Sequence, residues 1–128
     1  MENQKSALGL DANITALLGY IIGIVAIVLI FIEKDNKFVR FHAFQSVFLI
    51  VAYIACIIGM VILGIIAAVL GQVSGALGTI VGLLIMLLWF VVVFGFLGSL
   101  IYCAIKAYGG TMFKLPVIGN LAEKYSGN

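Results

Sequence analysis

The sequence predicts an all-α integral membrane protein with one domain over residues 1–128, and two observations support this fold class. Of the 128 residues, 65% are hydrophobic and only 9% are charged, whereas a soluble domain is usually about 45–50% apolar and about 25% charged. Uncharged runs long enough to cross a bilayer also follow one another along the chain. Because lipid offers the backbone no hydrogen-bond partners, these runs must be helical.

The first uncharged run covers residues 12–32. Its length of about 21 residues, at about 1.5 Å per residue, matches a hydrocarbon core of about 30 Å. No basic segment precedes the run and no small-residue cleavage site follows it, so it differs from a secretory signal peptide. We therefore expect a retained transmembrane helix over residues 12–32.

The second uncharged run, residues 41–105, contains no Asp, Glu, Lys or Arg and is too long for a single span. Its clearest break is the glycine-rich stretch 71–78, which predicts a tight hairpin. The run then divides into spans at about 44–70 and 77–105, which gives a bundle of three transmembrane helices. A bundle of four spans is the alternative.

The basic residues predict an orientation. With three spans, the N-terminal tail and the 71–78 turn share one side, which holds Lys5. The 33–43 loop and the C-terminal tail share the other side, and they hold Lys34, Lys37, Arg40, Lys106, Lys114 and Lys124. Because basic loops remain in the cytoplasm, we expect the N-terminus outside and the C-terminus and the 33–43 loop inside.

Small residues predict where helices approach one another. Gly19 and Gly23 form a GxxxG pair, and Gly59 and Gly82 lie at small positions of the later spans. Small side chains let helix backbones approach closely in lipid. We expect these glycines to pack helices within the chain, with self-association as the alternative.

The sequence lacks the residue patterns expected for disulfide bonding, metal binding, catalysis or nucleic-acid binding. Cys56 and Cys103 are expected at different depths, so both thiols should be free. No His, Cys, Asp or Glu cluster has metal-ligand spacing, so neither a metal nor a cofactor is expected. The spans hold no ionisable pair or catalytic motif, so the protein is not expected to be an enzyme. A net charge of +2 gives no indication of nucleic-acid binding.

Residues 34–46, KDNKFVRFHAFQS, hold much of the polar chemistry of the chain. The pair Asp35 and Asn36 offers a suitable N-cap for a helix that starts near Lys37 and continues into the second span. On that helix, His42, Gln45, Ser46 and Tyr53 would form a polar stripe that points at protein rather than lipid. Lys37 and Arg40 would reach lipid phosphates.

A second basic and amphipathic element follows the third span. Residues 113–125 contain Pro116, which suits a helix first turn, and then apolar residues at helical spacing. This pattern predicts a short helix in the membrane interface, close to residues 34–46. The candidate binding residues of the two elements are Lys37, Arg40, His42, Gln45, Ser46 and Lys114.

The stretches IEKDNKFVRFHAFQS and AYGGTMFKLPVIGNLAEK resemble a family of small prokaryotic membrane proteins of unknown function. That family is grouped with the twenty-kilodalton subunit of the chloroplast inner-envelope import translocon. The resemblance implies an all-helical bundle in a prokaryotic plasma membrane. It carries no catalytic residues over to this chain.

The functional prediction is an uncharacterised multi-pass membrane protein, an accessory or assembly factor that acts through its cytoplasmic face. Its expected partners are the bilayer, anionic lipid headgroups, and a membrane-protein partner or a second copy of the chain. One alternative is an oligomeric channel or protein-translocation component. Another is a lipid-headgroup-binding protein or an enzyme with His42 as base. In the simplest interpretation, His42 is a neutral hydrogen-bonding residue, and Lys37 and Arg40 are lipid anchors.

Overall fold

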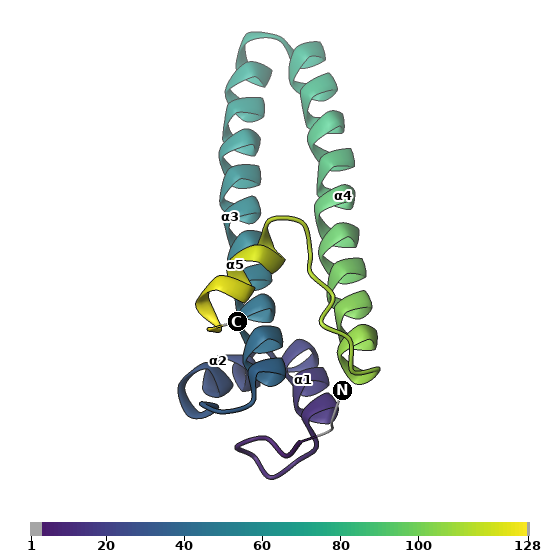
Figure 1. Cartoon of the computed structure of the whole chain (residues 1–128). Helices are drawn as coiled ribbons and strands as arrows, with labels where there is room; N and C mark the ends of the chain where they lie inside the picture. The colour runs from purple at the N-terminus through teal and green to yellow at the C-terminus, as the bar shows by residue number, and fades with distance from the viewer. Residues whose placement is uncertain (1–3, 128) are drawn as a thin grey trace. The chain divides into compact units, whose positions relative to one another are not determined.

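The computed structural model describes residues 4–127, which form helices joined by turns (Figure 1). In chain order the helices are α1 (Ala12–Ile21), α2 (Gly23–Ile32), α3 (Lys37–Val73), α4 (Gly75–Tyr108) and α5 (Ile118–Tyr125). Over the described residues no strand forms beyond an isolated bridge between Lys5 and Asp11. The all-α prediction is therefore confirmed.

The chain divides into two compact units. Unit 1 runs up to Ile50 and resumes at Gly98, so it contains α1, α2, α5, the first turns of α3 and the last turns of α4. Unit 2 comprises Val51–Leu97, the remainder of α3 and α4. The two units are described separately below.

Unit 2 is a hairpin of two apolar helix segments joined at Ser74 (Figure 1). The turn is tight because glycines face each other across it: a Cβ added to Gly78 would lie 2.5 Å from the Cα of Gly71. Most side chains of the hairpin point outward, and Val91 is 67% exposed. The prediction of a turn within 71–78 is confirmed. The outward apolar surface is the one that a bilayer would cover.

The expected single helix over residues 12–32 is wrong, because the helix breaks at Ile22 (φ −120°, ψ 98°). The resulting helices α1 and α2 have 10 residues each and fold back on each other. A Cβ on Gly19 would lie 3.7 Å from the Cβ of Ala26. Small residues on both helices therefore make the close approach possible.

The residues that flank the α1–α2 pair on its two sides, Ala7 and Glu33, are in contact. The backbone N–H of Ala7 donates to Oε2 of Glu33 at 2.6 Å. A helix spanning the bilayer would hold these residues about 30 Å apart. Among the described helices, α3 and α4 are long and apolar enough to cross a membrane, whereas α1 and α2 are shorter apolar helices.

The start of α3 agrees with the sequence prediction. The backbone N–H of Val39 donates to Oδ1 of Asn36 at 3.2 Å, so Asn36 is the N-cap. The helix then continues without interruption from Lys37 to Val73. The predicted 33–43 loop is thus shorter than expected, and α3 and α4 extend past the predicted limits of 44–70 and 77–105.

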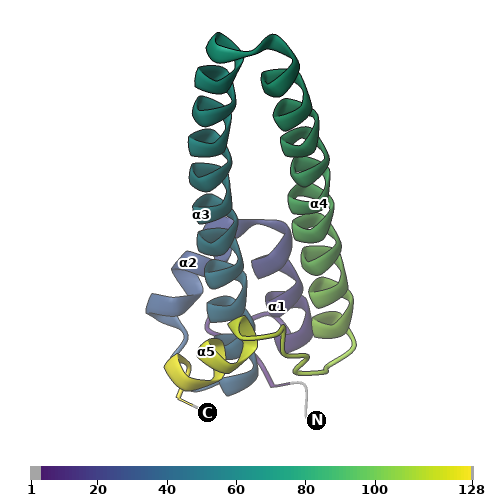
Figure 2. The same cartoon turned by 90° about the horizontal axis from the view of Figure 1, so that it is seen from above.

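The predicted C-terminal helix forms over Ile118–Tyr125, the later part of residues 113–125. It is preceded by a γ-turn, in which the N–H of Ile118 donates to the carbonyl of Pro116 at 2.7 Å and Val117 has φ 65° and ψ −54°. Helix α5 lies beside the first turns of α3 in both views (Figures 1 and 2), and the rings of Phe48 and Tyr125 are 5.8 Å apart.

Candidate functional site

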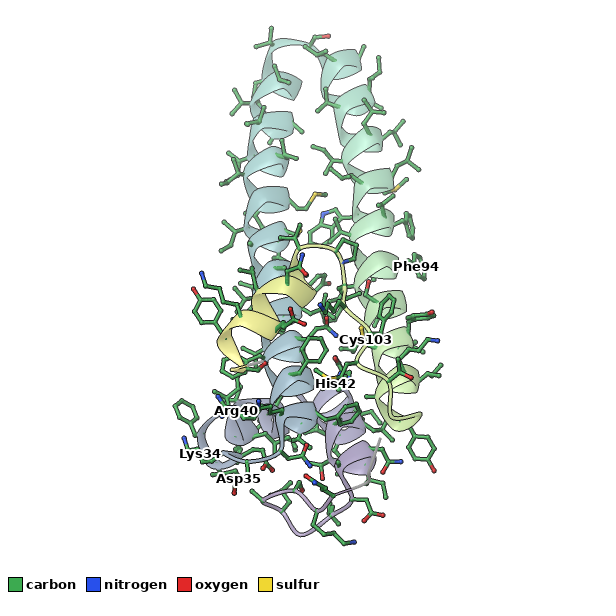
Figure 3. All side chains as sticks on the ribbon, viewed as in Figure 1. Lys34, Asp35, Arg40, His42, Phe94 and Cys103 are labelled. Atoms are coloured by element: carbon green, nitrogen blue, oxygen red, sulfur yellow. The ribbon has the colours of Figure 1, made fainter. Side chains whose placement is uncertain are left out.

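The core of unit 1 contains a buried group of hydrogen-bonded side chains, which we call the polar cluster: Tyr20 of α1 and His42, Gln45 and Ser46 of α3. Tyr20 is 2% exposed and the other three are 0% exposed. Figure 3 shows His42 between α3 and the last turns of α4, where Cys103 also lies. Buried polar groups are costly unless they find partners, so the partners of each member decide what the cluster can do.

His42 uses both ring nitrogens inside the protein. Its Nε2 lies 3.1 Å from the carbonyl oxygen of Thr111, and its Nδ1 lies 2.7 Å from Oη of Tyr20. Because a carbonyl only accepts, Nε2 must carry the hydrogen, and Nδ1 then accepts from the Tyr20 hydroxyl. The rings of Phe38 and Phe41 pack edge-on against the imidazole, with centroids at 4.6 and 5.0 Å. This geometry fits a neutral, structural histidine.

Gln45 connects α3 to α1 and to the segment before α5. Its Nε2 donates to Oη of Tyr20 at 2.8 Å and to the carbonyl of Phe113 at 2.9 Å. Its Oε1 accepts from the N–H of Leu115 at 3.0 Å. The amide therefore binds the backbone of residues 113–115 through both of its polar atoms.

Ser46 completes the cluster. Its Oγ donates to the carbonyl of Gly19 at 2.8 Å. Gly19 thus contacts α3 through its carbonyl, while its Cα faces Ala26 of α2. Three members of the predicted stripe, His42, Gln45 and Ser46, thus face protein, and their partners are mostly backbone atoms from distant parts of the chain. The fourth, Tyr53, lies outside the cluster and stacks on Phe96, with ring centroids 4.3 Å apart.

A second set of contacts ties the two ends of unit 1 together. Arg40 donates from Nε to the carbonyl of Ser126 at 3.1 Å and from a terminal nitrogen to the carbonyl of Glu33 at 2.6 Å. Glu33 is 3% exposed and accepts from the backbone N–H groups of Ala7 and Asn36 at 2.6 and 3.1 Å. Arg40 therefore holds the end of α5 against the turn before α3.

The remaining candidate binding residues lie at the surface of unit 1. Lys37 is exposed. Lys114 forms an ion pair with Glu123 at 2.6 Å, with both side chains about two-fifths exposed (43% and 39%). The structure thus separates the six candidates into an internal group, His42, Gln45, Ser46 and most of Arg40, and a surface group, Lys37 and Lys114. Their role in binding remains a prediction.

The four glycines predicted to pack helices fall into two groups, according to whether an added Cβ would meet a neighbouring atom. A Cβ on Gly23 would lie 2.9 Å from Cδ1 of Ile50, and Gly19 contacts Ala26, so both residues lie at close approaches within unit 1. A Cβ on Gly59 or Gly82 would meet no atom within 4 Å. These two glycines therefore take part in no tight contact within unit 2.

Sequence reasoning missed Tyr20 and Glu33 as members of the site. A lone tyrosine in the middle of an apolar run is a usable signal, because a hydroxyl in such a place needs a partner. Glu33 carried no such signal, since a carboxylate at the end of an apolar run is ordinarily solvated. Its burial follows from the return of α2 to Ala7, which local sequence does not reveal.

Metal-binding groups do not gather in the part of the chain that the structure describes. No three His, Cys, Asp or Glu residues there are placed to hold a metal ion. Cys56 is exposed and Cys103 is buried, and both are free, as predicted. The Sγ of Cys103 lies 3.7 Å from Nε2 of Gln45, at the edge of the polar cluster.

Comparison with known proteins shows what the chain is similar to. Residues 3–122 match the model of the magnetosome magnetite crystal formation protein family. A UPF0132 membrane protein of Methanocaldococcus jannaschii is 41% identical over 95% of this chain and 94% of its own length. Another from that organism is 34% identical over 93% of this chain and 73% of its own length.

A third relative extends the same pattern. A UPF0132 membrane protein of Archaeoglobus fulgidus is 33% identical over 90% of this chain and 95% of its own length. No solved structure matches. The expected likeness to small prokaryotic membrane proteins is confirmed, whereas these comparisons give no support to the likeness to the chloroplast import subunit.

Proposed function

The chain belongs to the magnetosome magnetite crystal formation protein family, with archaeal UPF0132 membrane proteins among its relatives, and we propose that it is a membrane-anchored accessory or assembly factor. In this proposal unit 2 is the anchor and unit 1 is the working part. The observation that carries the proposal is the charge distribution: all 7 Lys and Arg residues belong to unit 1, and Val51–Leu97 has none.

Unit 2 has the dimensions of an anchor. Each of its helix segments, 51–73 and 75–97, is about 23 residues long and therefore about 35 Å, slightly more than a hydrocarbon core of about 30 Å. Neither segment contains an ionisable Asp, Glu, Lys or Arg. A hairpin of this kind is favoured in lipid, because the backbone groups within its helices are bonded to one another.

We propose that α3 and α4 are the membrane spans and that α1 and α2 enter and leave on one side. The contact between Ala7 and Glu33 supports a common side for the two ends of that segment. Asn13 supports it as well, since its Nδ2 donates to the carbonyl of Tyr108 at the end of α4, at 2.9 Å. Both chain ends then share a side.

This arrangement changes the expected orientation of the N-terminus. With two spans, every basic residue of the chain lies on one side and the 71–78 turn on the other has none. The difference in basic residues between the two sides is larger than in the three-span arrangement, because Lys5 now lies on the same side as the other basic residues. By the positive-inside rule both termini are cytoplasmic. The proposal thus keeps the C-terminus inside and moves the N-terminus inside as well.

The surface of unit 1 suggests its partners. Lys34, Lys37 and Lys124 are exposed, and Lys124 lies over the ring of Tyr125 at 5.6 Å. Lysines beside interfacial aromatic rings suit the phosphates of anionic lipids. We propose that this surface binds anionic headgroups and a membrane-protein partner, which includes a second copy of the chain.

The alternatives receive less support. An enzyme with His42 as base would need a free ring nitrogen, yet both nitrogens of His42 have partners inside unit 1. A channel or translocation role would need polar groups to line a path through unit 2. The groove between its helices is lined by apolar and small residues: Cys56, Gly59, Met60, Ile62, Leu63, Leu88 and Val92.

Thiol labelling from each side of the membrane tests the arrangement. Single substitutions Leu8→Cys, Lys124→Cys and Gln72→Cys place new thiols at exposed positions. A membrane-impermeant maleimide should label Leu8→Cys and Lys124→Cys from the cytoplasmic side and Gln72→Cys from the outside. Unsubstituted protein gives the background from Cys56 and Cys103. Labelling of Leu8→Cys and Lys124→Cys from opposite sides would contradict the two-span arrangement.

Site-specific crosslinking tests the accessory role. The photoreactive side chain is placed at Lys34, because this residue is exposed and lies close in sequence to the candidate binding residues. Phe41 and His42 are unsuitable positions, since both are 0% exposed. We expect capture of one defined membrane protein, competed by unlabelled protein and weakened by Lys37→Glu. A probe at Gln72 is the matched control. If the probe at Lys34 yields the same products as the probe at Gln72, the accessory role is wrong.

A further inference from the structure

We propose that the polar cluster of unit 1 includes a recognition site for an extended peptide, and that two copies of the chain exchange the peptide that fills it. In the structure the site is filled by residues 111–115 of the same chain, which we call the docked segment. The inference rests on one partner named in the proposed function, a second copy of the chain. It uses contacts within unit 1 only.

The docked segment is bound to α3 as an extended peptide is bound in a recognition groove. It lies between α4 and α5 and contains neither helix nor turn. The carbonyl of Thr111 accepts from Nε2 of His42 at 3.1 Å. The carbonyl of Phe113 and the N–H of Leu115 bind the two polar atoms of the Gln45 side chain, at 2.9 and 3.0 Å. Every second residue thus presents a backbone group to α3, as one edge of a strand does.

The side-chain amide of Gln45 takes the place of a peptide group in a neighbouring strand. In a parallel pair, a residue of one strand binds the carbonyl of one residue on its neighbour and the N–H of the residue two positions later. Gln45 makes the same two bonds, to Phe113 and Leu115. Sheet edges bind peptides by this main-chain pattern. The site therefore recognises an extended backbone, and nothing in the hydrogen bonds requires that backbone to belong to its own chain.

Alternate side chains of the docked segment supply the selectivity. Leu115 is 8% exposed, and the ring of Phe113 packs edge-on against that of Tyr102, with centroids 4.8 Å apart. Lys114, between them in sequence, is exposed and pairs with Glu123. The site thus selects apolar residues two positions apart. Every copy of the chain carries these residues at this spacing, so the segment of a second copy matches the site as well as the chain's own segment does.

The chain leaves α4 through glycines that can redirect it. The N–H of Gly110 donates to the carbonyl of Ala107 at 3.0 Å, and the N–H of Thr111 donates to that of Lys106 at 2.9 Å. These bonds form a Schellman motif, which depends on the φ of 82° at Gly110. Glycine leaves this conformation at little cost. When extended, residues 109–112 span about 14 Å, so the segment reaches a copy that lies beside its own.

A strained residue lies between the docked segment and α5. Val117 has φ 65° and ψ −54°, a geometry that is rare for any residue and unfavourable for a β-branched one. The chain is held on both sides of it, because Gln45 binds Leu115 and Arg40 binds Ser126. Release of the segment relieves this strain. Undocking, the first step of an exchange, is therefore easier than the contacts alone would make it.

Exchange between two copies retains the contacts of the docked segment. The hydrogen bonds and buried side chains are the same in either copy, so the hinge at Gly110 and the local concentration decide between the two forms. Confinement of the copies to one membrane raises their local concentration. We therefore expect closed monomers when the protein is dilute in lipid and exchanged pairs when it is dense.

Photocrosslinking between two tagged copies tests the exchange. Copy A carries a photoreactive phenylalanine analogue at Phe113, and copy B carries a different affinity tag. Full-length chains of both are reconstituted together in vesicles of phosphatidylcholine and phosphatidylglycerol. We expect a product of A with B, crosslinked near Tyr102 of B, and its yield should rise with protein density. Crosslinks that stay within copy A at every density, or that join B far from the site, would overturn the inference.

Changing the site in one copy at a time gives a sharper test. Gln45→Leu in copy A weakens the site that competes for the probe, so the yield of the A–B product should rise several-fold. Gln45→Leu in copy B weakens the receiving site, so the yield should fall several-fold. Gln72→Leu in either copy is the matched control and should change nothing. A dimer held by any other surface would respond in the same direction to both Gln45 variants, and that result would overturn the exchange.

A milder variant keeps the test independent of how Gln45→Leu folds. Arg40→Gln leaves the polar cluster intact and weakens only the attachment of Ser126, so it should shift the yields in the same two opposite directions. Equal shifts in both copies would again overturn the exchange. The accessory role survives such a failure if the probe at Lys34 still captures a defined membrane protein. If neither probe captures a protein, both proposals fail.

Discussion

Both units of the molecule contain strongly apolar helices, such as α2 in unit 1, but the two units are stabilised in different ways. In unit 1, side chains such as His42 and Gln45 are fully buried and bind backbone groups far away in the chain. In unit 2, side chains such as Ile58 and Val91 are 57% and 67% exposed. The stability of unit 1 thus depends on specific internal hydrogen bonds, whereas the stability of unit 2 depends on a surrounding medium that covers its apolar side chains. Apolar composition alone does not distinguish a span from a segment that folds back.

The largest effect should come from Gln45→Leu. The substitution leaves the carbonyl of Phe113 and the N–H of Leu115 without their partner, and it removes one of the two partners of the Tyr20 hydroxyl, which keeps His42. We expect a loss of about 3 kcal/mol in the free energy of unfolding, since each unsatisfied buried group costs about 1–3 kcal/mol. Reversible unfolding in mixed micelles measures it. The control is Gln72→Leu, at an exposed position of unit 2. Equal effects of the two substitutions would contradict the contrast between the units.

The next effect should come from His42→Phe. The aromatic ring is retained, but the hydrogen bonds to Tyr20 and Thr111 are lost. We expect about 2 kcal/mol of destabilisation and faster proteolysis within residues 109–117. His42→Gln, which keeps a donor and an acceptor, should recover part of the stability. A fully stable His42→Phe variant would show that the imidazole is dispensable to the cluster.

Unit 2 should respond to volume rather than to polarity. Gly78→Ala introduces a Cβ that would lie 2.5 Å from the Cα of Gly71, so the turn must open, at a cost of about 1–2 kcal/mol. Gly82→Ala is the matched control, because its Cβ would meet no atom within 4 Å. Helix-hairpin stability in micelles separates the two. A loss of stability in Gly82→Ala that matches Gly78→Ala would show that the turn is not the tight contact.

The smallest effect should come from Arg40→Gln. The change removes the charged donors to Ser126 and Glu33 at the periphery of unit 1. We expect about 1 kcal/mol of global destabilisation, together with a local release of α5 that exposes the C-terminal residues to carboxypeptidase. Lys34→Gln, at an exposed position nearby, should change neither quantity. Protection of the C-terminus in Arg40→Gln would argue against its role in holding α5.

Much of the fold could be predicted from the sequence. The turn at 71–78, the cap at Asn36 and the helix after Pro116 all depend on local signals, such as glycines, a capping side chain and helical spacing. The break at Ile22 has only the neighbouring Gly23 as a local signal, and that glycine was interpreted as a helix-packing position. No proline or charged residue marks it, and it follows from contacts between α1 and α2 and between Ala7 and Glu33.

The candidate site was predictable in part for the same reason. The spacing of His42, Gln45 and Ser46 correctly indicated a polar face on one helix that points at protein. Their partners were not predictable, because the carbonyls of Gly19, Thr111 and Phe113 carry no sequence signature. Arg40 was expected at lipid phosphates, and its internal partners are likewise carbonyls, those of Ser126 and Glu33.

The return of residues 12–32 to their starting side is the central claim, and one distance tests it most directly. Spin labels at Leu8→Cys and Lys34→Cys, both exposed positions, flank the α1–α2 pair. In protein reconstituted into bilayers, pulsed electron–electron double resonance should give a distribution centred well below about 30 Å, the thickness of the hydrocarbon core. A distribution centred above about 30 Å would mean that these residues cross the membrane, and it would contradict the account.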